Sequence, residues 1–229
     1  MKEDYFIFDN LDRYLKYTKK ENTKDIIRDV NSDIDNKFYT NVKNTDLSKG
    51  YLILVNKFNK LDSNYTPSNL VNIDKKYGNP LQIEKTTYEQ FIKMYNDAAK
   101  KNLYLYIRSP YRSYNTQLSL YNNYVATDGK INADTYSARA GYSEHQTGLA
   151  MDLTTPKTLL GKFEGTKECD WLKNNAHKYG FILRYPKGKE YLTGYMYESW
   201  HYRYVGIEAA TTIYENDLTF EEYYAYYVK

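Results

Sequence analysis

Two short segments constrain the fold of this 229-residue chain most, because their side chains form a chemical unit only if they meet in space. The first segment is residues 143–152 and the second is residues 198–201. Three nitrogen or oxygen ligands with a separate carboxylate nearby are typical of a catalytic zinc site, which keeps its fourth position open for water. Zinc accepts imidazole and carboxylate ligands and needs no cysteine. The four candidate residues are His145, Asp152, Glu198 and His201.

The chain has only three histidines, and an isolated histidine is more often a core or surface residue than a metal ligand. Near His145, Gly148 allows a tight turn and a close approach of the backbone. Trp200 precedes His201 and can form an apolar wall, which strengthens electrostatic interactions at a metal. His177 lacks such neighbours and is expected to be a solvated residue near a helix end. The two histidines of the motif segments are therefore the better ligand candidates.

Three sequence segments together resemble a known family. Residues 143–152 read S-E-H-Q-T-G-L-A-M-D, residues 198–203 read E-S-W-H-Y-R, and residues 109–117 read S-P-Y-R-S-Y-N-T-Q. In this order they resemble the signature of the VanY-type D-alanyl-D-alanine carboxypeptidases. These are zinc peptidases of bacterial cell walls, related to the VanX dipeptidases and the LdcB-type L,D-carboxypeptidases. The resemblance covers roughly residues 50–206.

The resemblance implies a bound Zn²⁺ with His145, Asp152 and His201 as its ligands. Glu198 is then expected to be the general base, which takes a proton from the attacking water and delivers it to the leaving amine. Its alternative role is to support His201 from outside the ligand set. Arg112 lies at a predicted strand-to-helix junction and is expected to hold the developing oxyanion, rather than to act only as a surface cation.

Three further residues are expected to bind substrate. Gln117 is placed to hydrogen-bond a substrate amide or carboxylate. Ser143 is expected to donate to a terminal carboxylate, although an ordinary turn serine is the alternative. Arg203 follows His201 by two positions, so on a strand it faces the same side, where it can contact substrate or fix a ligand carboxylate.

Composition excludes several other classes of protein. The net charge is only +3, and no run of Lys or Arg supports nucleic-acid binding. Cys169 is the only cysteine, so an internal disulfide is impossible. No segment approaches the ~18 apolar residues of a membrane span, and the start is not a signal peptide. Because the family acts outside the bacterial membrane, we expect an extracytoplasmic location and a membrane anchor in a segment absent here.

The pattern of elements predicts an α+β fold, with a small antiparallel sheet flanked by helices and the zinc site on one sheet face, as in hedgehog/D-Ala-D-Ala peptidase-like proteins. Residues 1–49 are predicted to form a helical arm or spacer, and residues 50–229 the catalytic domain. Residues 127–142 are expected to be a polar loop. The predicted strands are 51–55, 103–108, 149–153, 181–185 and 195–204. Three helices are predicted by their ranges, 10–20, 171–180 and 205–216. Four more are predicted by their first residues: one is capped by Thr23, one opens with a Thr87–Gln90 capping box, one is capped by Ser113 and one by Thr219.

The expected function is zinc-dependent D,D-carboxypeptidase action, which removes the C-terminal D-Ala from peptidoglycan stem peptides. One alternative is an L,D-carboxypeptidase that acts on tetrapeptide stems, and residues 127–142 are expected to decide between the two. A second alternative is a non-catalytic cell-wall binding module. Glu198 argues against that module, because a structural zinc site has no use for a general base and normally closes its fourth position.

Overall fold

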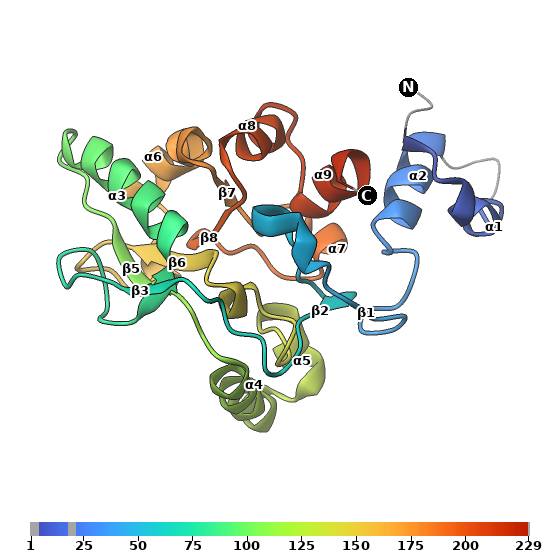
Figure 1. Ribbon diagram of the computed structural model, residues 1–229, viewed down its shortest axis with the longest axis horizontal. Helices are drawn as coiled ribbons and strands as arrows, with labels where there is room; N and C mark the ends of the chain where they lie inside the picture. Colours follow the sequence, from blue (N-terminus) through green and yellow to red (C-terminus); the bar gives the residue numbers. More distant parts are fainter. Residues whose placement is uncertain (1–4, 18–21, 229) are drawn as a thin grey trace.

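The computed structural model describes residues 5–17 and 22–228 (Figure 1). Its centre is a four-stranded sheet in the order β5-β6-β8-β7, and every neighbouring pair of strands is antiparallel. The predicted α+β class with a small antiparallel sheet is confirmed. The strands are β5 (Tyr106–Ser109), β6 (Ala150–Thr154), β7 (Phe181–Leu183) and β8 (His201–Tyr204).

Side chains alternate across this sheet and separate a core face from a polar face. Met151 of β6 and Tyr202 of β8 are fully buried in the main hydrophobic core. Residues of helices α3 (Lys85–Ala99) and α6 (Lys167–Asn175) complete that core. Since strand side chains alternate, Asp152 and His201 point to the opposite face, and they are directly paired across β6 and β8. The sheet thus brings residues of the two motif segments side by side.

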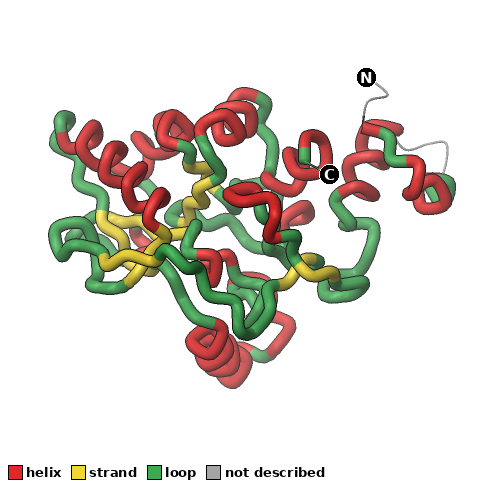
Figure 2. Tube along the Cα trace, in the orientation of Figure 1, coloured by secondary structure: helices red, strands yellow, loops and turns green. Residues whose placement is uncertain are grey.

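In the view of Figure 2, helices lie above and below the strands of this sheet, and further helices lie to the right of it. Two small sheets accompany it: β1 (Lys43–Asn44) pairs parallel with β2 (Asn59–Lys60), and β3 (Leu70–Asn72) pairs antiparallel with β4 (Gln82–Glu84). The remaining α-helices of the described residues are α1 (Leu11–Tyr14), α2 (Thr23–Asn31), α4 (Tyr114–Asp128), α5 (Lys130–Tyr136), α7 (Glu190–Thr193), α8 (Ile207–Glu215) and α9 (Phe220–Tyr227). The 3₁₀ helices are η2 (Phe8–Asn10), η3 (Leu47–Leu52), η4 (Glu144–Thr147), η5 (Leu160–Lys162) and η6 (Ala176–Tyr179).

The prediction of a strand at residues 51–55 is wrong. This segment ends the 3₁₀ helix η3 and then continues as buried chain outside any strand. Its carbonyl groups find a side-chain partner instead of a neighbouring strand: Arg203 Nη2 donates to the carbonyls of Tyr51 and Ile53, at 2.9 and 2.8 Å. A short apolar run indicates burial but cannot specify how the backbone is hydrogen-bonded.

The prediction that residues 127–142 form a loop is also wrong, because α5 lies within them. Gly129 separates α5 from α4 with a φ of 76°, a conformation that favours glycine. The only buried side chain of α5 is Ala133, so the helix shows no apolar stripe in its sequence. Strand 195–204 is likewise shorter than predicted and comprises only β8.

Helix caps were predicted with mixed success. The caps at Ser113 and Thr219 are confirmed, and Thr219 forms a capping box with Glu222. Helix α3 instead begins two residues before Thr87, because the Glu84 carboxylate accepts the Thr87 backbone N–H at 2.7 Å.

At the N-terminal end, helix α2 begins at Thr23 itself, and Asn22 is its N-cap in place of the predicted Thr23. Of the predicted helix 10–20, the structure contains η2 and α1, whereas residues 18–20 lie outside the described residues. Helix α2 contacts the C-terminal helix α9, and the two helices lie side by side (Figure 1). None of the helices in the described ranges is long and apolar enough to cross a bilayer.

Candidate active site

The polar sheet face carries three side chains that together could hold a metal ion. One ligand atom from each of His145, Asp152 and His201 lies within 4.8 Å of the others, and all three residues are buried. His145 Nε2 is 3.4 Å from Asp152 Oδ2, and His201 Nδ1 is 3.1 Å from Asp152 Oδ1. Asp152 and His201 come from paired strands, whereas His145 comes from the 3₁₀ helix η4 just before β6.

A glycine brings η4 to this position. Gly148 ends η4 with a φ of 69°, in the left-handed region that favours glycine. A Cβ atom there would lie 3.1 Å from the Glu84 backbone nitrogen, and the Gly148 carbonyl accepts a hydrogen bond from that nitrogen at 3.2 Å. The close approach expected from the sequence at Gly148 is therefore present.

Hydrogen bonds orient both histidine rings toward the group. His145 Nδ1 is 2.7 Å from the Pro110 carbonyl oxygen, so it carries the proton and leaves Nε2 with its lone pair facing Asp152. His201 presents Nδ1 to Asp152, while its Nε2 lies 3.6 Å from Glu144 Oε2. The resulting donor set of two imidazole nitrogens and one carboxylate, without sulfur, fits Zn²⁺.

The charge on each member of the group depends on its burial and on the charges next to it. Burial lowers the pKa of His145, which keeps this ring neutral. Burial also opposes protonation of His201, but the nearby carboxylates of Asp152 and Glu144 outweigh it and raise the pKa of His201 to about 9. Burial disfavours the Asp152 carboxylate, yet His145 and His201 hold its pKa well below the usual range. A positive charge between these side chains is therefore favoured, whether from a proton or from a cation.

Glu198 lies at the edge of this group and not within it. Its Oε2 is 3.6 Å from His201 Nδ1, and the side chain is almost fully buried. The backbone N–H of Glu198 donates to the Tyr185 carbonyl at 3.1 Å, which fixes the turn that leads into β8. Burial raises the pKa of the Glu198 carboxyl to about 8.

Arg112 is held at the same site by neighbouring side chains. Its Nη1 donates to Gln117 Oε1 at 2.5 Å, and its Nη2 donates to Ser109 Oγ at 2.7 Å. Its backbone N–H donates to the His145 carbonyl at 3.1 Å, which ties this segment to η4. Gln117 also donates to the Ala138 carbonyl at 2.6 Å, so both ends of its amide are engaged within the protein.

These side chains share one cavity of about 470 Å³. Its polar side includes Ser143, Arg112 and Glu198, and Trp200 forms part of the expected apolar wall. Helix α5 and the turn after it also contribute to the wall, so residues 127–142 do border the site. The other lining residues are Ser109, Gln117, Leu120, Tyr124, Tyr136, Ser137, Ala138, Glu144, His145, Asp152, Leu160, Tyr185, Tyr195, Met196 and His201.

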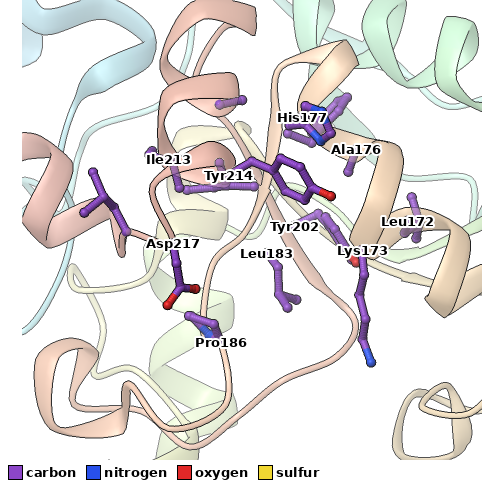
Figure 3. A pocket seen from close by; sticks show the side chains of 14 residues that line it. Leu172, Lys173, Ala176, His177, Leu183, Pro186, Tyr202, Ile213, Tyr214 and Asp217 are labelled. Carbon is purple, nitrogen blue, oxygen red and sulfur yellow. The ribbon is translucent and has the colours of Figure 1, made fainter.

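A second hollow, of about 190 Å³, lies against α6 and α8 and is lined mostly by apolar side chains (Figure 3). It contains the third histidine, His177, whose ring stacks on Tyr214 with 3.8 Å between ring centroids. Within the described residues, His177 stays outside the group of potential metal ligands. The polar cavity is therefore the stronger candidate for a catalytic site.

Arg203 does not lie in the cavity where it was expected to contact the substrate. It shares the strand face of His201, as predicted, but it is fully buried and does not line the cavity. Its Nη1 donates to Glu144 at 2.9 Å, and its other nitrogens donate to backbone carbonyls. The expected contact with substrate is corrected accordingly: Arg203 fixes a carboxylate, and this carboxylate belongs to Glu144.

Sequence reasoning missed Glu144. This residue is completely buried beside His201, and its Oε1 accepts from Arg184 at 2.8 Å and from Arg203 at 2.9 Å. Burial opposes its ionisation, but the two arginines hold its pKa far below the usual range. The only signal was its place directly before His145, and glutamate is so rarely buried that the sequence favours an exposed role.

The sequence of the chain matches a known protein family. The sequence profile of VanY, described as D-alanyl-D-alanine carboxypeptidase, matches residues 80–207, which is more than half of the chain. The chain belongs to the VanY family. The predicted resemblance is confirmed, and the family is one of carboxypeptidases, which hydrolyse peptide bonds.

Individual members agree with this assignment. YodJ of Bacillus subtilis, named as a candidate carboxypeptidase, is 40% identical over 223 residues, which cover 90% of this chain and 80% of YodJ. The structure of the LD-carboxypeptidase LdcB superposes with a TM-score of 0.75 at 40% identity and covers 81% of this chain and 90% of LdcB. A mutant of the D,D-pentapeptidase VanY from the VanB-type resistance cassette, in complex with Zn(II), superposes with a TM-score of 0.67 at 35% identity and covers 76% of this chain and 98% of that chain.

Proposed function

We propose that the protein is a zinc-dependent D-alanyl-D-alanine carboxypeptidase that removes the C-terminal D-Ala from peptidoglycan stem peptides. The observation that supports this most is the buried His-Asp-His group, which shares a cavity with Glu198 and Arg112. A structural zinc site would use a fourth protein ligand. Here the fourth side chain, the carboxylate of Glu198, lies at the edge of the group and lines the cavity, which favours catalysis over a binding module.

In this proposal, Zn²⁺ is held by His145 Nε2, the Asp152 carboxylate and His201 Nδ1. When bound, the ion supplies Lewis-acid chemistry, which activates water and polarises the scissile carbonyl. The protein supplies the orientation of the ligands: the Pro110 carbonyl fixes the His145 ring, and Glu144 faces the far nitrogen of His201.

Glu198 is proposed as the general acid–base residue. In the metal-free protein, burial raises the pKa of its carboxyl group to about 8, and a cation on the neighbouring ligands would lower that pKa again. A carboxyl group of this kind can accept and return a proton near neutral pH. It takes the proton of the attacking water and delivers it to the amine of the departing D-Ala. Its Oε2 lies 3.6 Å from His201 Nδ1, so the carboxylate is next to the proposed reacting atoms.

Arg112 and Ser143 are proposed as the residues that hold the substrate's oxygens. Because Gln117 and Ser109 fix the guanidinium before substrate arrives, Arg112 is preorganised for the negative charge that develops on the carbonyl oxygen. Ser143 borders the same cavity and is proposed to donate to the terminal carboxylate. Both the oxygen and the nitrogen of the Gln117 amide are already hydrogen-bonded within the protein. We therefore propose that its main role is to hold Arg112, and that contact with the substrate is its lesser role.

An L,D-carboxypeptidase that acts on tetrapeptide stems is the second candidate. It is supported by the superposition with LdcB, whose TM-score is higher than that of VanY. The two reactions differ in the configuration of the residue before the cleaved bond, so the cavity wall next to that residue decides between them.

Peptidoglycan lies outside the membrane, so either reaction implies that the protein acts there. A membrane anchor in a longer form of the chain stays a prediction. Residues 1–49 as an arm and residues 50–229 as the catalytic unit are also part of the proposal.

The test is an HPLC assay of D-Ala release from synthetic pentapeptide and tetrapeptide stems, with Zn²⁺ added or removed by a chelator. We expect zinc-dependent release with a higher kcat/KM on the pentapeptide. A higher kcat/KM on the tetrapeptide would replace the D,D assignment by the L,D one. Zinc binding without cleavage of either peptide would favour the binding module.

A further inference from the structure

A chain of buried charges leads away from the proposed zinc site to the C-terminal helix. It begins at Glu144, whose Oε2 faces His201 Nε2 at 3.6 Å. Neither of these two atoms has a hydrogen-bond partner within 3.5 Å among the described residues. The other oxygen, Oε1, accepts from Arg184 Nε at 2.8 Å and from Arg203 Nη1 at 2.9 Å. The arginines therefore hold one oxygen and leave the second for the histidine.

The chain continues from Arg184 to Glu221 of helix α9. Arg184 Nη1 and Nη2 donate to Glu221 Oε2 and Oε1 at 2.8 and 2.6 Å, a bidentate pair. Asn56 Nδ2 also donates to Glu221 Oε1, at 3.2 Å. All these side chains are buried, so each charge depends on its partners and not on water. Both Asn56 and Glu221 lie outside residues 80–207, the segment that matches the family profile.

The charges balance only when all four members are present. Glu144 and Glu221 carry two negative charges, and Arg184 and Arg203 carry two positive charges. Without Glu221, two of the three guanidinium nitrogens of Arg184 lose their acceptors inside the protein. The nearest remaining carboxylate is Glu144, and its free oxygen Oε2 is the one that faces His201.

We propose that Glu221 is a positioning residue for the metal ligand His201: it engages Arg184, so that Glu144 Oε2 stays available to accept the His201 Nε2 proton. With the proton fixed on Nε2, Nδ1 keeps its lone pair for the cation. Loss of Glu221 lets Arg184 compete for Oε2, and the His201 ring then loses the acceptor that fixes its tautomer. This inference rests on the proposed zinc site, and it extends that site to a helix about twenty residues further along the chain.

The test compares Glu221→Gln with Glu222→Gln in the full chain. Glu222 is the next residue of α9, and its carboxylate caps the helix by accepting from Thr219. A loss of helix stability alone would appear in both variants, whereas an effect through Arg184 would appear only in Glu221→Gln. Zinc affinity is measured by competition with a chromophoric chelator. We expect the zinc Kd to rise roughly 10–100-fold in Glu221→Gln, the usual range for a partner of a metal ligand, and to stay within about threefold in Glu222→Gln.

Glu221→Asp keeps the charge and is the rescue variant, expected to fold even where Glu221→Gln does not and to bind zinc more tightly than the glutamine variant. At saturating zinc, Glu221→Gln should regain most of the wild-type kcat, because the residue acts on the ligand and not on substrate. A zinc Kd for Glu221→Gln that equals that of Glu222→Gln would overturn the proposal while the zinc site stands. If Glu221→Gln cannot be purified, Glu221→Asp is compared with Glu222→Asp: the shorter side chain holds Arg184 less well than the native glutamate, so its zinc Kd should exceed that of Glu222→Asp, and equal Kd values would overturn the proposal. Absence of zinc binding in the wild-type protein would instead overturn the proposed function, and this inference with it.

Discussion

At the scale of single residues, two carboxyl groups of the site, Asp152 and Glu198, differ in pKa because their surroundings differ. Asp152 lies between two histidines and stays ionised, whereas Glu198 is buried with a pKa raised to about 8. Two carboxyl groups with pKa values pushed apart are typical of a division between ligand and acid–base roles. The difference is set by the charges around each group and not by residue type.

The first prediction concerns Glu198. Changing Glu198→Gln should leave zinc bound and lower kcat by roughly 10²–10⁴, because the proton acceptor is lost while the three ligands remain. Changing His201→Ala should lower the zinc content itself. Metal analysis and stem-peptide kinetics on both variants check this. An empty metal site in Glu198→Gln would make Glu198 a ligand or a ligand support.

The second prediction concerns Arg112. Removing an oxyanion donor costs about 2.7–4 kcal/mol, so Arg112→Ala should lower kcat and kcat/KM together by about 10²–10³. Arg112→Lys keeps the charge but loses the planar fork that Gln117 and Ser109 hold, so it should recover only part of the rate. Michaelis–Menten kinetics separate the outcomes. If KM rises while kcat holds, Arg112 binds the substrate carboxylate in the ground state.

The resemblance of the three motif segments to a known family was sufficient to select residues that the structure brings together. His145, Asp152 and His201 meet as a group, and Glu198 and Arg112 line the same cavity, which the three motif segments predicted together. Glu144 and the burial of Arg203 could not be predicted. Their positions depend on each other and on Arg184, which lies in a segment without any motif, so only the assembled fold reveals them.

At the scale of elements, the cavity walls depend on a lysine from outside the family segment. Lys57 is buried, and its Nζ donates to the carbonyls of Asp134 and Gly194 at 2.6 and 2.5 Å. Asp134 belongs to α5, and Gly194 directly precedes Tyr195, a lining residue. One ammonium group thus joins two segments that form different parts of the wall.

The third prediction is that Lys57→Met raises KM more than it lowers kcat. The variant leaves two buried carbonyls without their donor, which loosens the wall but does not touch the ligands, and each unsatisfied group costs about 1–3 kcal/mol of stability. Stem-peptide kinetics and thermal unfolding measure both effects. Lys60→Met, at an exposed position three residues later, is the matched control. A pure loss of kcat would show that Lys57 acts on the reacting groups instead.

The strongly patterned elements were predictable, and the others were not. Strands β6 and β7 were predicted from short apolar runs in the sequence. The caps at Ser113 and Thr219 were predicted from the ability of these side chains to accept hydrogen bonds from nearby backbone N–H groups. The apolar run at 51–55 gave a false strand, because its carbonyls bind Arg203, a residue about 150 positions away. Helix α5 has a single buried residue, so no periodic signal distinguishes it from a loop.

At the scale of the whole molecule, residues on both sides of the segment that matches the family profile contribute to the surroundings of the site. The segment that matches the family profile ends at residue 207, yet Glu221 reaches the site through Arg184, and Lys57 joins its walls. Helix α2 packs against α9, which carries Glu221. The stability of the chain and the geometry of the site are therefore coupled, and the coupling should be visible in how unfolding depends on pH and metal.

The last prediction concerns this dependence. In the metal-free protein, the folded state raises the pKa of Glu198 from 4.5 to about 8 and that of His201 from 6.5 to about 9. Both groups bind protons more tightly when folded, so their contribution to stability is complete below the unfolded pKa and is lost as pH rises through the folded pKa. Lys57, whose pKa burial lowers to about 8, acts in the opposite sense only above that pH.

His145, whose pKa burial lowers from 6.5, opposes this trend below pH 6.5. Between pH 5 and 8, the metal-free protein should therefore lose stability mainly above pH 6.5, where Glu198 and His201 both titrate. Zinc competes with the same protons, so its affinity should increase over this range. The difference in Tm between zinc-saturated and chelator-treated protein should widen from pH 5 to pH 8, by about 5 °C or more, since one kcal/mol corresponds to roughly 2–4 °C for a chain of this size. Thermal unfolding at three pH values measures it, and Glu198→Gln, which cannot titrate, should reduce the widening. A Tm difference that stays constant or narrows would show that these two groups do not exchange their protons for the metal.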